Sequence, residues 1–221
     1  MIRTKDLFDL SCTAAAPLLN DTEYPWQALP RITEFILTLG PTLSSDEYEQ
    51  RGENIWVSRK AKIAPTAYIG GPAIIMEGAE LRHCAFVRGS ALIGKGATLG
   101  NSCEVKNAIL FDGAEVPHFN YIGDSVLGHR AHFGAGSITS NIKSDRRNII
   151  IRTESERMET GMRKIGALVG DFVEVGCNAV LCPGTVVGRN SVIYPLVRVR
   201  GVIPENSIVK APDIIVPKEA R

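Results

Sequence analysis

The sequence has almost no excess of either charge, since its 221 residues include 25 lysines and arginines against 24 aspartates and glutamates. This balance gives no reason to expect nucleic acid or an anionic membrane as a partner, because both favour a basic surface. The chain also lacks an apolar run near the ~20 residues that cross a bilayer. It lacks the charged, apolar and small-residue order of a secretion signal as well. We therefore expect a cytoplasmic protein with no nucleic-acid and no membrane partner.

Cysteines are few, odd in number and scattered, at Cys12, Cys84, Cys103, Cys177 and Cys182. A disulfide framework needs paired cysteines and an oxidising compartment. We expect reduced, packed thiols instead.

What the sequence does have is a strict period of six. An aliphatic or aromatic residue recurs at Val57, Ile63, Ile69, Ile75, Leu81, Val87, Ile93, Leu99, Val105 and Phe111. A small residue follows most of them four positions later, at Ala67, Ala73, Ala79, Ala85, Ala91, Ala97 and Cys103. Neither a helix nor a single strand has this period. Hexads are typical of an all-β solenoid, and three of them per coil predict a left-handed parallel β-helix.

The period also divides the chain. Residues 1–52 lack it, and Pro25 with Gly40 brackets an apolar spacing typical of a helix. We expect these residues to form a small, partly helical cap over one open end of the solenoid. The β-helix itself is expected over 53–204, with a charged inserted loop at 143–163, and 205–221 form a tail. Within the solenoid the period breaks where Pro117 stands in place of an aliphatic residue.

Chemistry is expected where the repeat is interrupted. Arg88 and Lys106 are eighteen residues apart, which predicts that they stack on one outer face, where a phosphate would satisfy both cations. Two solvated side chains that splay apart have the same spacing. His118 lies in the break and is suited to removing a proton near neutral pH, although a loop histidine is more often a plain surface residue. The backbone of Gly134–Gly136 offers N–H donors to an anion or a thioester carbonyl.

Three motifs carry a resemblance to a known family: Val105-Lys-Asn-Ala-Ile-Leu, Pro117-His-Phe-Asn-Tyr-Ile-Gly-Asp and Phe133-Gly-Ala-Gly-Ser-Ile-Thr-Ser-Asn. The chain resembles the acetyltransferase half of the bifunctional N-acetylglucosamine-1-phosphate uridyltransferase and glucosamine-1-phosphate N-acetyltransferase, a trimeric left-handed β-helix enzyme. The match covers residues 88–141 without a gap, and about 164–203 after the insertion.

The resemblance implies an acetyl-CoA-dependent acyltransferase that acts on an amino or hydroxyl group of a sugar phosphate or nucleotide sugar, in UDP-N-acetylglucosamine biosynthesis. His118 corresponds to the general base, and the backbone at Ala135 to the group that holds the oxyanion. The implied substrate-binding residues are Arg88, Lys106, Tyr121, His132 and Lys164. The implied acetyl-CoA contacts are Ala135, Asn141, Cys177 and Pro195. The family also implies a homotrimer with sites between subunits and no metal for the transfer.

Two departures and two alternatives stay open. His132 stands where the family has an asparagine that touches the sugar, and Ile142 where it has a tyrosine. A non-catalytic β-helix that binds a sugar nucleotide or another subunit would explain both changes. A γ-type carbonic anhydrase, whose zinc is held by three histidines, is suggested by the spacing of His83 and His118, but the third position is Gly123. No Gly-rich nucleotide-binding half precedes the repeats in this sequence, so uridyltransferase activity is not expected.

Overall fold

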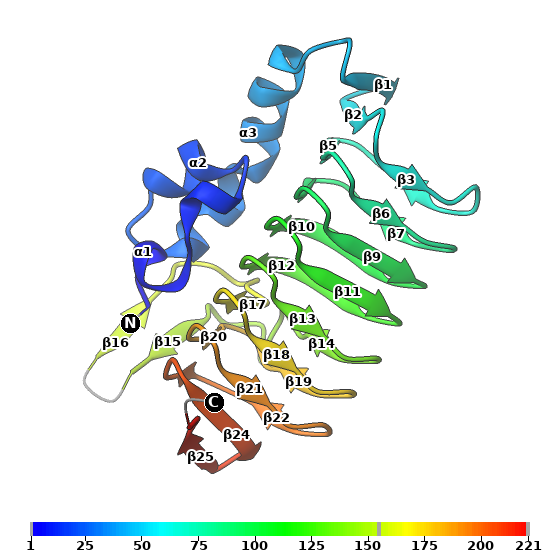
Figure 1. The fold of residues 1–221 in the computed structure, drawn as a ribbon. Helices are drawn as coiled ribbons and strands as arrows, with labels where there is room; N and C mark the ends of the chain where they lie inside the picture. Colours follow the sequence, from blue (N-terminus) through cyan, green and yellow to red (C-terminus); the bar gives the residue numbers. More distant parts are fainter. Residues whose placement is uncertain (1, 154–155, 220–221) are drawn as a thin grey trace.

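The computed structural model describes residues 2–153 and 156–219, most of which wind into a three-faced β-solenoid of about eight turns (Figure 1). Almost every strand pairs in parallel with the strand one turn before it and the strand one turn after it. The left-handed parallel β-helix predicted from the hexads is confirmed.

Each face of the solenoid is a ladder of short strands. The first face contains β2 (Ile55–Ser58), β5 (Ala73–Ile75), β8 (Ala91–Ile93), β17 (Ala167–Val169), β20 (Thr185–Val187) and β23 (Val202–Ile203). The second contains β3 (Lys62–Ile63), β6 (Glu80–Leu81), β9 (Thr98–Asn101), β11 (Glu115–His118), β13 (His132–Phe133), β18 (Glu174–Val175), β21 (Val192–Ile193) and β24 (Ser207–Ala211). The third contains β4 (Tyr68–Ile69), β7 (Phe86–Val87), β14 (Ile138–Thr139), β19 (Val180–Leu181) and β22 (Arg198–Val199). Two longer strands, β10 (Glu104–Leu110) and β12 (Tyr121–Leu127), run from the third face onto the first.

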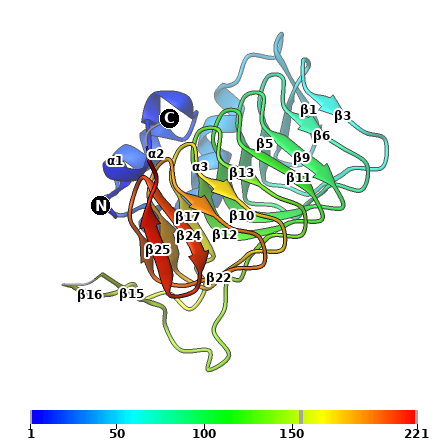
Figure 2. The ribbon, with the colours of Figure 1, turned by 60° about the horizontal axis from the view of Figure 1, so that its bottom comes forward.

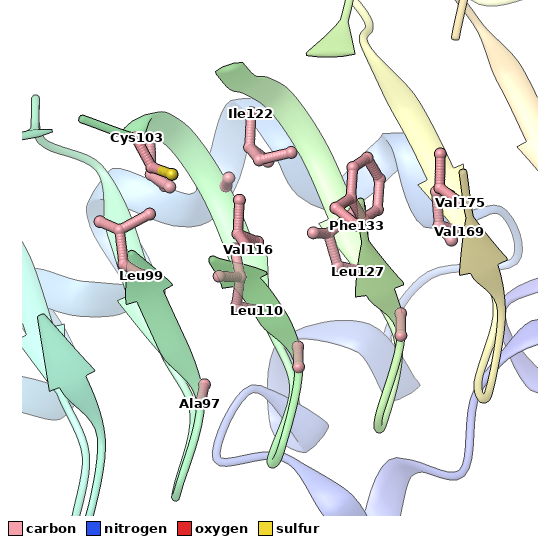
Figure 3. Packing of buried hydrophobic residues seen from close by; sticks show 14 of the residues in the cluster. Ala97, Leu99, Cys103, Leu110, Val116, Ile122, Leu127, Phe133, Val169 and Val175 are labelled. Atoms are coloured by element: carbon pink, nitrogen blue, oxygen red, sulfur yellow. The ribbon is translucent and has the colours of Figure 1, made fainter. Parts of the chain in front are cut away.

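The hexad residues form the inner core. Leu99 pairs with Val116 on the second face, and Phe133 with Val175, so these side chains stack along the axis (Figure 3). Each fully buried aliphatic or aromatic side chain contributes about 1.5–3 kcal/mol to stability, because its apolar surface is removed from water.

The prediction that Phe111 is the tenth inward residue was wrong. Leu110, not Phe111, faces the inner core, since Leu110 pairs with Ile93, while Phe111 packs outside the solenoid. The reason is a corner one residue shorter: Asn107 alone has a positive φ there, where the preceding coil uses both Gly89 and Ser90. The period therefore shifts before Pro117, and β11 runs without interruption through Val116 and His118.

The N-terminal helices confirm the helical segment but lie along the first face, not over an open end (Figures 1 and 2). They are α1 (Thr4–Leu7), α2 (Ala16–Asn20) and α3 (Ile32–Leu39), with 3₁₀ turns at Leu10–Cys12, Pro25–Arg31 and Gly40–Thr42. The first face is apolar on its outer side as well, through Ile74, Leu92, Ile109, Val126, Leu168 and Val186. Covering that stripe removes more apolar surface from water than capping one coil would.

The helix expected between Pro25 and Gly40 is divided. Residues Pro25–Arg31 form a 3₁₀ helix, and regular α-helix begins only at Ile32. Pro30 explains the division, because a proline inside an α-helix removes one hydrogen bond and disfavours the α conformation of the preceding residue.

Antiparallel strands cover the two terminal coils. β1 (Tyr48–Gly52) pairs with β2, and β25 (Ile214–Pro217) pairs with β24. Paired edges expose fewer free backbone groups to other chains. The tail expected at 205–221 thus contains strands that continue and close the second face, and the proposed division into cap, solenoid and tail stays a prediction.

The charged insertion is folded. An antiparallel bridge between Ile142 and Lys164 closes its base, and β15 (Ile150–Arg152) pairs with β16 (Arg157–Glu159). Ile149 and Ile151 are buried in the outer apolar cluster with the helices. Among the described residues, no helix is long and apolar enough to span a membrane.

Candidate active site

One edge of the three-faced solenoid, between the second and third faces, carries four of the expected site residues. His118, Ala135, Cys177 and Pro195 occupy the same corner position in four consecutive coils. We call this line the His118 edge. Backbone hydrogen bonds join its coils, because Gly136 N donates to His118 O (3.0 Å), Asn178 N to Ala135 O (2.8 Å) and Leu196 N to Cys177 O (2.9 Å). With coils about 4.8 Å apart, the general base expected from the family resemblance therefore lies one coil from the backbone expected to hold the oxyanion.

His118 ends β11, and its side chain is exposed. The next residue, Phe119, has φ +52° and is also exposed, so the chain turns sharply onto the third face. An imidazole in this place is open to a ligand that lies along the edge.

The backbone next to His118 offers a free donor. The N–H groups of Gly134 and Gly136 donate to Val175 and His118, whereas the N–H of Ala135 has no backbone partner in the described part of the chain. Ala135 is half-buried. An outward N–H held on both sides by paired neighbours is the geometry that stabilises a developing oxyanion.

The expected cation pair lies on the third face. Val87 pairs with Val105, so Arg88 and Lys106 follow each other in adjacent coils as the spacing predicted. Each cation already has a carboxylate partner, however. Arg88 Nη1 lies 2.6 Å from Glu104 Oε1, and Lys106 Nζ lies 3.1 Å from Asp124 Oδ1.

Asp124 organises this part of the face. Its carboxylate is 4% exposed and accepts hydrogen bonds from Lys106 Nζ, Asn107 Nδ2 (2.9 Å) and Asn141 Nδ2 (2.5 Å). Three donors satisfy a carboxylate that would otherwise be costly to bury. Asn141, which the resemblance assigned to acetyl-CoA, therefore also belongs to the Lys106 cluster.

Tyr121 lies between the cation pair and the His118 edge. Its ring is half-buried and its hydroxyl accepts a hydrogen bond from Asn141 Nδ2 at 3.1 Å. Burial raises the pKa of the Tyr121 phenol, and the nearby carboxylates of Asp124 and Glu104 raise it further. The phenol therefore stays neutral, and its proton is available to a ligand. Gly123 leaves room for it, because a Cβ there would collide with the Tyr121 hydroxyl.

Two expected residues lie apart from this group. His132 is on the outer side of the second face, where its Nδ1 lies 3.0 Å from Glu174 Oε2 and it shares a shallow hollow with Glu115 and Arg130. Lys164 is exposed at the base of the insertion. Within one chain, the structure does not bring His132 to Tyr121 or to the cations.

Across residues 2–153 and 156–219, no three histidine, cysteine, aspartate or glutamate side chains gather as metal ligands. His83 and His118 share the edge but are two coils apart, with Asn101 between them.

No protein-family model matches the chain. It is similar to a bifunctional sugar-1-phosphate nucleotidylyltransferase/acetyltransferase of Sulfurisphaera tokodaii, with 36% identity over 97 residues, 44% of this chain and 24% of that protein. It is 29% identical to the bifunctional protein GlmU of Methanococcus aeolicus over 91% of this chain and 49% of that protein. It is 38% identical to GlmU of Methanocaldococcus jannaschii over 42% of this chain and 22% of that protein. The predicted resemblance is confirmed.

The chain thus spans about half or less of the length of these curated relatives. Among solved structures, a UDP-N-acetylglucosamine acyltransferase of Francisella novicida shares 14% identity with a TM-score of 0.38, over 69% of this chain and 62% of that one.

Sequence reasoning missed two residues that hold the site together. Asp124 is eighteen residues after Lys106, the same spacing that predicted the Arg88 and Lys106 neighbours, and so could have been found. Asn120 occupies a small-residue position of the repeat and is buried against the next coil. The only sign of its role in the sequence is a polar residue at a position where the repeat otherwise has a small one.

Proposed function

We propose that this chain catalyses acyl transfer from acetyl-CoA to an amino or hydroxyl group of a sugar phosphate or nucleotide sugar. The observation that carries the proposal is the His118 edge, which stacks His118, Ala135, Cys177 and Pro195 in consecutive coils. The two groups that acyl transfer needs, a general base and a backbone N–H, are neighbours there. One similar protein is named a bifunctional sugar-1-phosphate nucleotidylyltransferase/acetyltransferase.

The chemistry follows from these groups. The acceptor nitrogen or oxygen attacks the thioester carbonyl carbon while His118 removes its proton. Negative charge develops on the carbonyl oxygen, and the N–H of Ala135 stabilises it. When the carbonyl reforms, the carbon–sulfur bond breaks and the CoA sulfur leaves as the thiolate, which His118 protonates. The products are the acetylated acceptor and free CoA.

Arg88 and Lys106 are proposed to bind the acceptor phosphate. The Arg88–Glu104 ion pair is exposed, so exchanging the carboxylate for a phosphate costs little. Tyr121, between these cations and the edge, would then contact the sugar. Lys164 is proposed as a further substrate contact, and Asn141, Cys177 and Pro195 as acetyl-CoA contacts.

The insertion supports an acceptor with more negative charge than a sugar monophosphate. Its residues 143–163 include six lysines and arginines against four aspartates and glutamates in a chain with net charge +1. Arg146, Arg147 and Arg163 are exposed and have no ion pair among the described residues. The insertion leaves the solenoid directly after Asn141. We therefore propose a nucleotide sugar as the preferred acceptor.

We further propose a homotrimer whose sites lie between subunits. His132 and the third-face residues lie on different faces of one chain, so a site that uses both requires a second copy. The exposed Phe119 and Leu196 along the His118 edge supply apolar surface for such contact.

A non-catalytic sugar-nucleotide-binding β-helix is the second candidate. It is favoured by His132, which pairs with Glu174 on another face, and by Ile142 in place of a tyrosine.

The deciding experiment mixes the protein with acetyl-CoA and a panel of amino-sugar phosphates and nucleotide sugars, and measures CoA thiol release and acetylated product by mass. Turnover with one acceptor supports the transferase. Saturable acceptor binding without thiol release supports the binding protein. Stoichiometric zinc in the purified protein would support the carbonic anhydrase instead.

A further inference from the structure

Asn120 is a buried polar residue at the corner that carries His118. It is 3% exposed and stands directly before Tyr121. Five other coils place a small residue at this inner corner position, namely Ala67, Ala85, Cys103, Ser137 and Ala179. A carboxamide is larger than any of these side chains, and a buried amide costs stability unless its donors and acceptor are all satisfied.

The Asn120 amide is satisfied by three consecutive coils. Its Oδ1 accepts the backbone N–H of His118 at 2.9 Å and lies 3.5 Å from the thiol of Cys103 in the preceding coil. Its Nδ2 donates to Gly134 O at 2.8 Å, and also to Ser137 O and Ser137 Oγ at 2.9 and 3.1 Å in the following coil. One side chain therefore links His118 to both ends of the Gly134–Ser137 turn.

This side chain replaces a backbone hydrogen bond. In five other coils the residue at the inner corner position donates its N–H to the carbonyl three residues earlier, as Ser137 does to Gly134. The hydrogen bonds of the described residues include no such bond from Asn120 to Pro117. The Asn120 N–H instead points to the sulfur of Cys103 at 3.3 Å. The His118 turn is closed by the amide of Asn120.

We propose that Asn120 is a positioning residue for acyl transfer, which sets His118 relative to the free N–H of Ala135. This inference rests on the proposed function. The amide fixes the His118 backbone from one side and the carbonyl of Gly134, next to Ala135, from the other. Base and oxyanion donor thereby keep one relative geometry, and a misplacement of about 1 Å in such a pair costs about 10²-fold in rate.

The carboxamide is required because it both accepts and donates. An aspartate has no donor for Gly134 O and Ser137 O and would place a negative charge beside these oxygens. Alanine occupies the same position in the coils of Ala85 and Ala179, so Asn120→Ala is compatible with the fold. It removes the link between the two coils and leaves the Gly134 carbonyl to the backbone N–H and hydroxyl of Ser137.

The experiment compares Asn120→Ala with Ser191→Ala. Ser191 is also buried and links two coils, since its Oγ donates to Pro204 O at 2.7 Å and accepts from Ser207 N at 3.1 Å, but it lies at another corner. We expect kcat to fall about 10²-fold in Asn120→Ala with the KM for acetyl-CoA unchanged, and expect kcat to be unchanged in Ser191→Ala. An unchanged kcat in Asn120→Ala, or an equal loss in both variants, would overturn the proposal.

A second readout does not depend on turnover. In Asn120→Ala, we expect the imidazole NMR signals of His118 to shift and the Gly136 amide, which donates to His118 O, to exchange faster with solvent. His83, two coils away, serves as the internal reference. If the wild-type protein proves inactive, the proposed function fails, but the NMR comparison still decides whether Asn120 holds His118. Unchanged His118 signals and unchanged Gly136 protection would refute that role.

Discussion

The ammonium of Lys106 lies 3.1 Å from a carboxylate oxygen of Asp124, and that carboxylate is almost completely buried. Two asparagine amides complete its hydrogen bonds, so the expected phosphate-binding lysine is held at a defined place on the third face before any ligand arrives. Arg88, in contrast, has a half-buried partner, and Arg88 itself is exposed. The two cations are neighbours but have different roles in the fold.

Replacing Asp124 by alanine is expected to destabilise the protein by about 1–3 kcal/mol, because three donors lose their acceptor at a buried position. The matched control is Glu104→Ala, which removes the half-buried partner of the exposed Arg88 and should cost no more than about 1 kcal/mol. Urea unfolding of both variants measures the difference. A larger loss in Glu104→Ala would contradict this account of the two ion pairs.

Phe111→Ala tests the packing of the N-terminal helices. The Phe111 ring is fully buried, with its centroid 5.0 Å from that of Phe8, and its loss should cost about 3–5 kcal/mol. Leu37→Ala, on the exposed side of helix α3, should change stability by no more than about 0.5 kcal/mol. Thermal or urea unfolding distinguishes the two. Equal effects would mean that the helices do not pack on the first face in solution.

Alkylation should separate the cysteines by their surroundings. Burial raises the pKa of the Cys103 thiol. Because a raised pKa leaves less thiolate at any given pH, Cys103 should react slowly at pH 8 and faster only as the pH rises further. Cys84 and Cys177 are exposed and should react first. Mass spectrometry of the alkylated peptides identifies the order, and early modification of Cys103 in folded protein would disagree with its burial.

The insertion arginines test the acceptor class. We expect the triple variant of Arg146, Arg147 and Arg163 to alanine to raise the KM for a nucleotide sugar by about tenfold, which corresponds to about 1.4 kcal/mol, with a smaller effect on a sugar monophosphate. A control triple variant at Arg31, Arg51 and Arg59 removes the same charge from exposed sites elsewhere. An equal rise for both acceptors, or in both triple variants, would reject the nucleotide-sugar proposal.

The sequence was sufficient for the solenoid because each hexad residue contacts its equivalents one coil away, so register follows from spacing alone. The pairing of Val87 with Val105 shows this directly. The same rule failed at Phe111. The corner before it is one residue shorter, so the sixth position after Val105 holds an aromatic side chain that faces outward. Periodicity cannot distinguish inside from outside where both sides of a strand are apolar.

The site was predictable where its residues share one corner position of the repeat. Residues at one corner position, such as His118 and Ala135, were placed by the resemblance, and the coil register brings them together. The partners of Arg88 and Lys106 were not expected, because outward charges on adjacent coils can pair in several ways. Asn120 was not recognised because its role depends on carbonyl groups of the next coil, which a sequence does not display.

The most direct test of the central claim is acetyl-CoA turnover by His118→Ala beside His83→Ala. Both histidines occupy the same corner position on the same edge, two coils apart, and both are exposed. If His118 is the general base, thiol release with the best acceptor should fall about 10²–10⁴-fold in His118→Ala and remain at the wild-type rate in His83→Ala. Full turnover by His118→Ala would contradict the proposed mechanism.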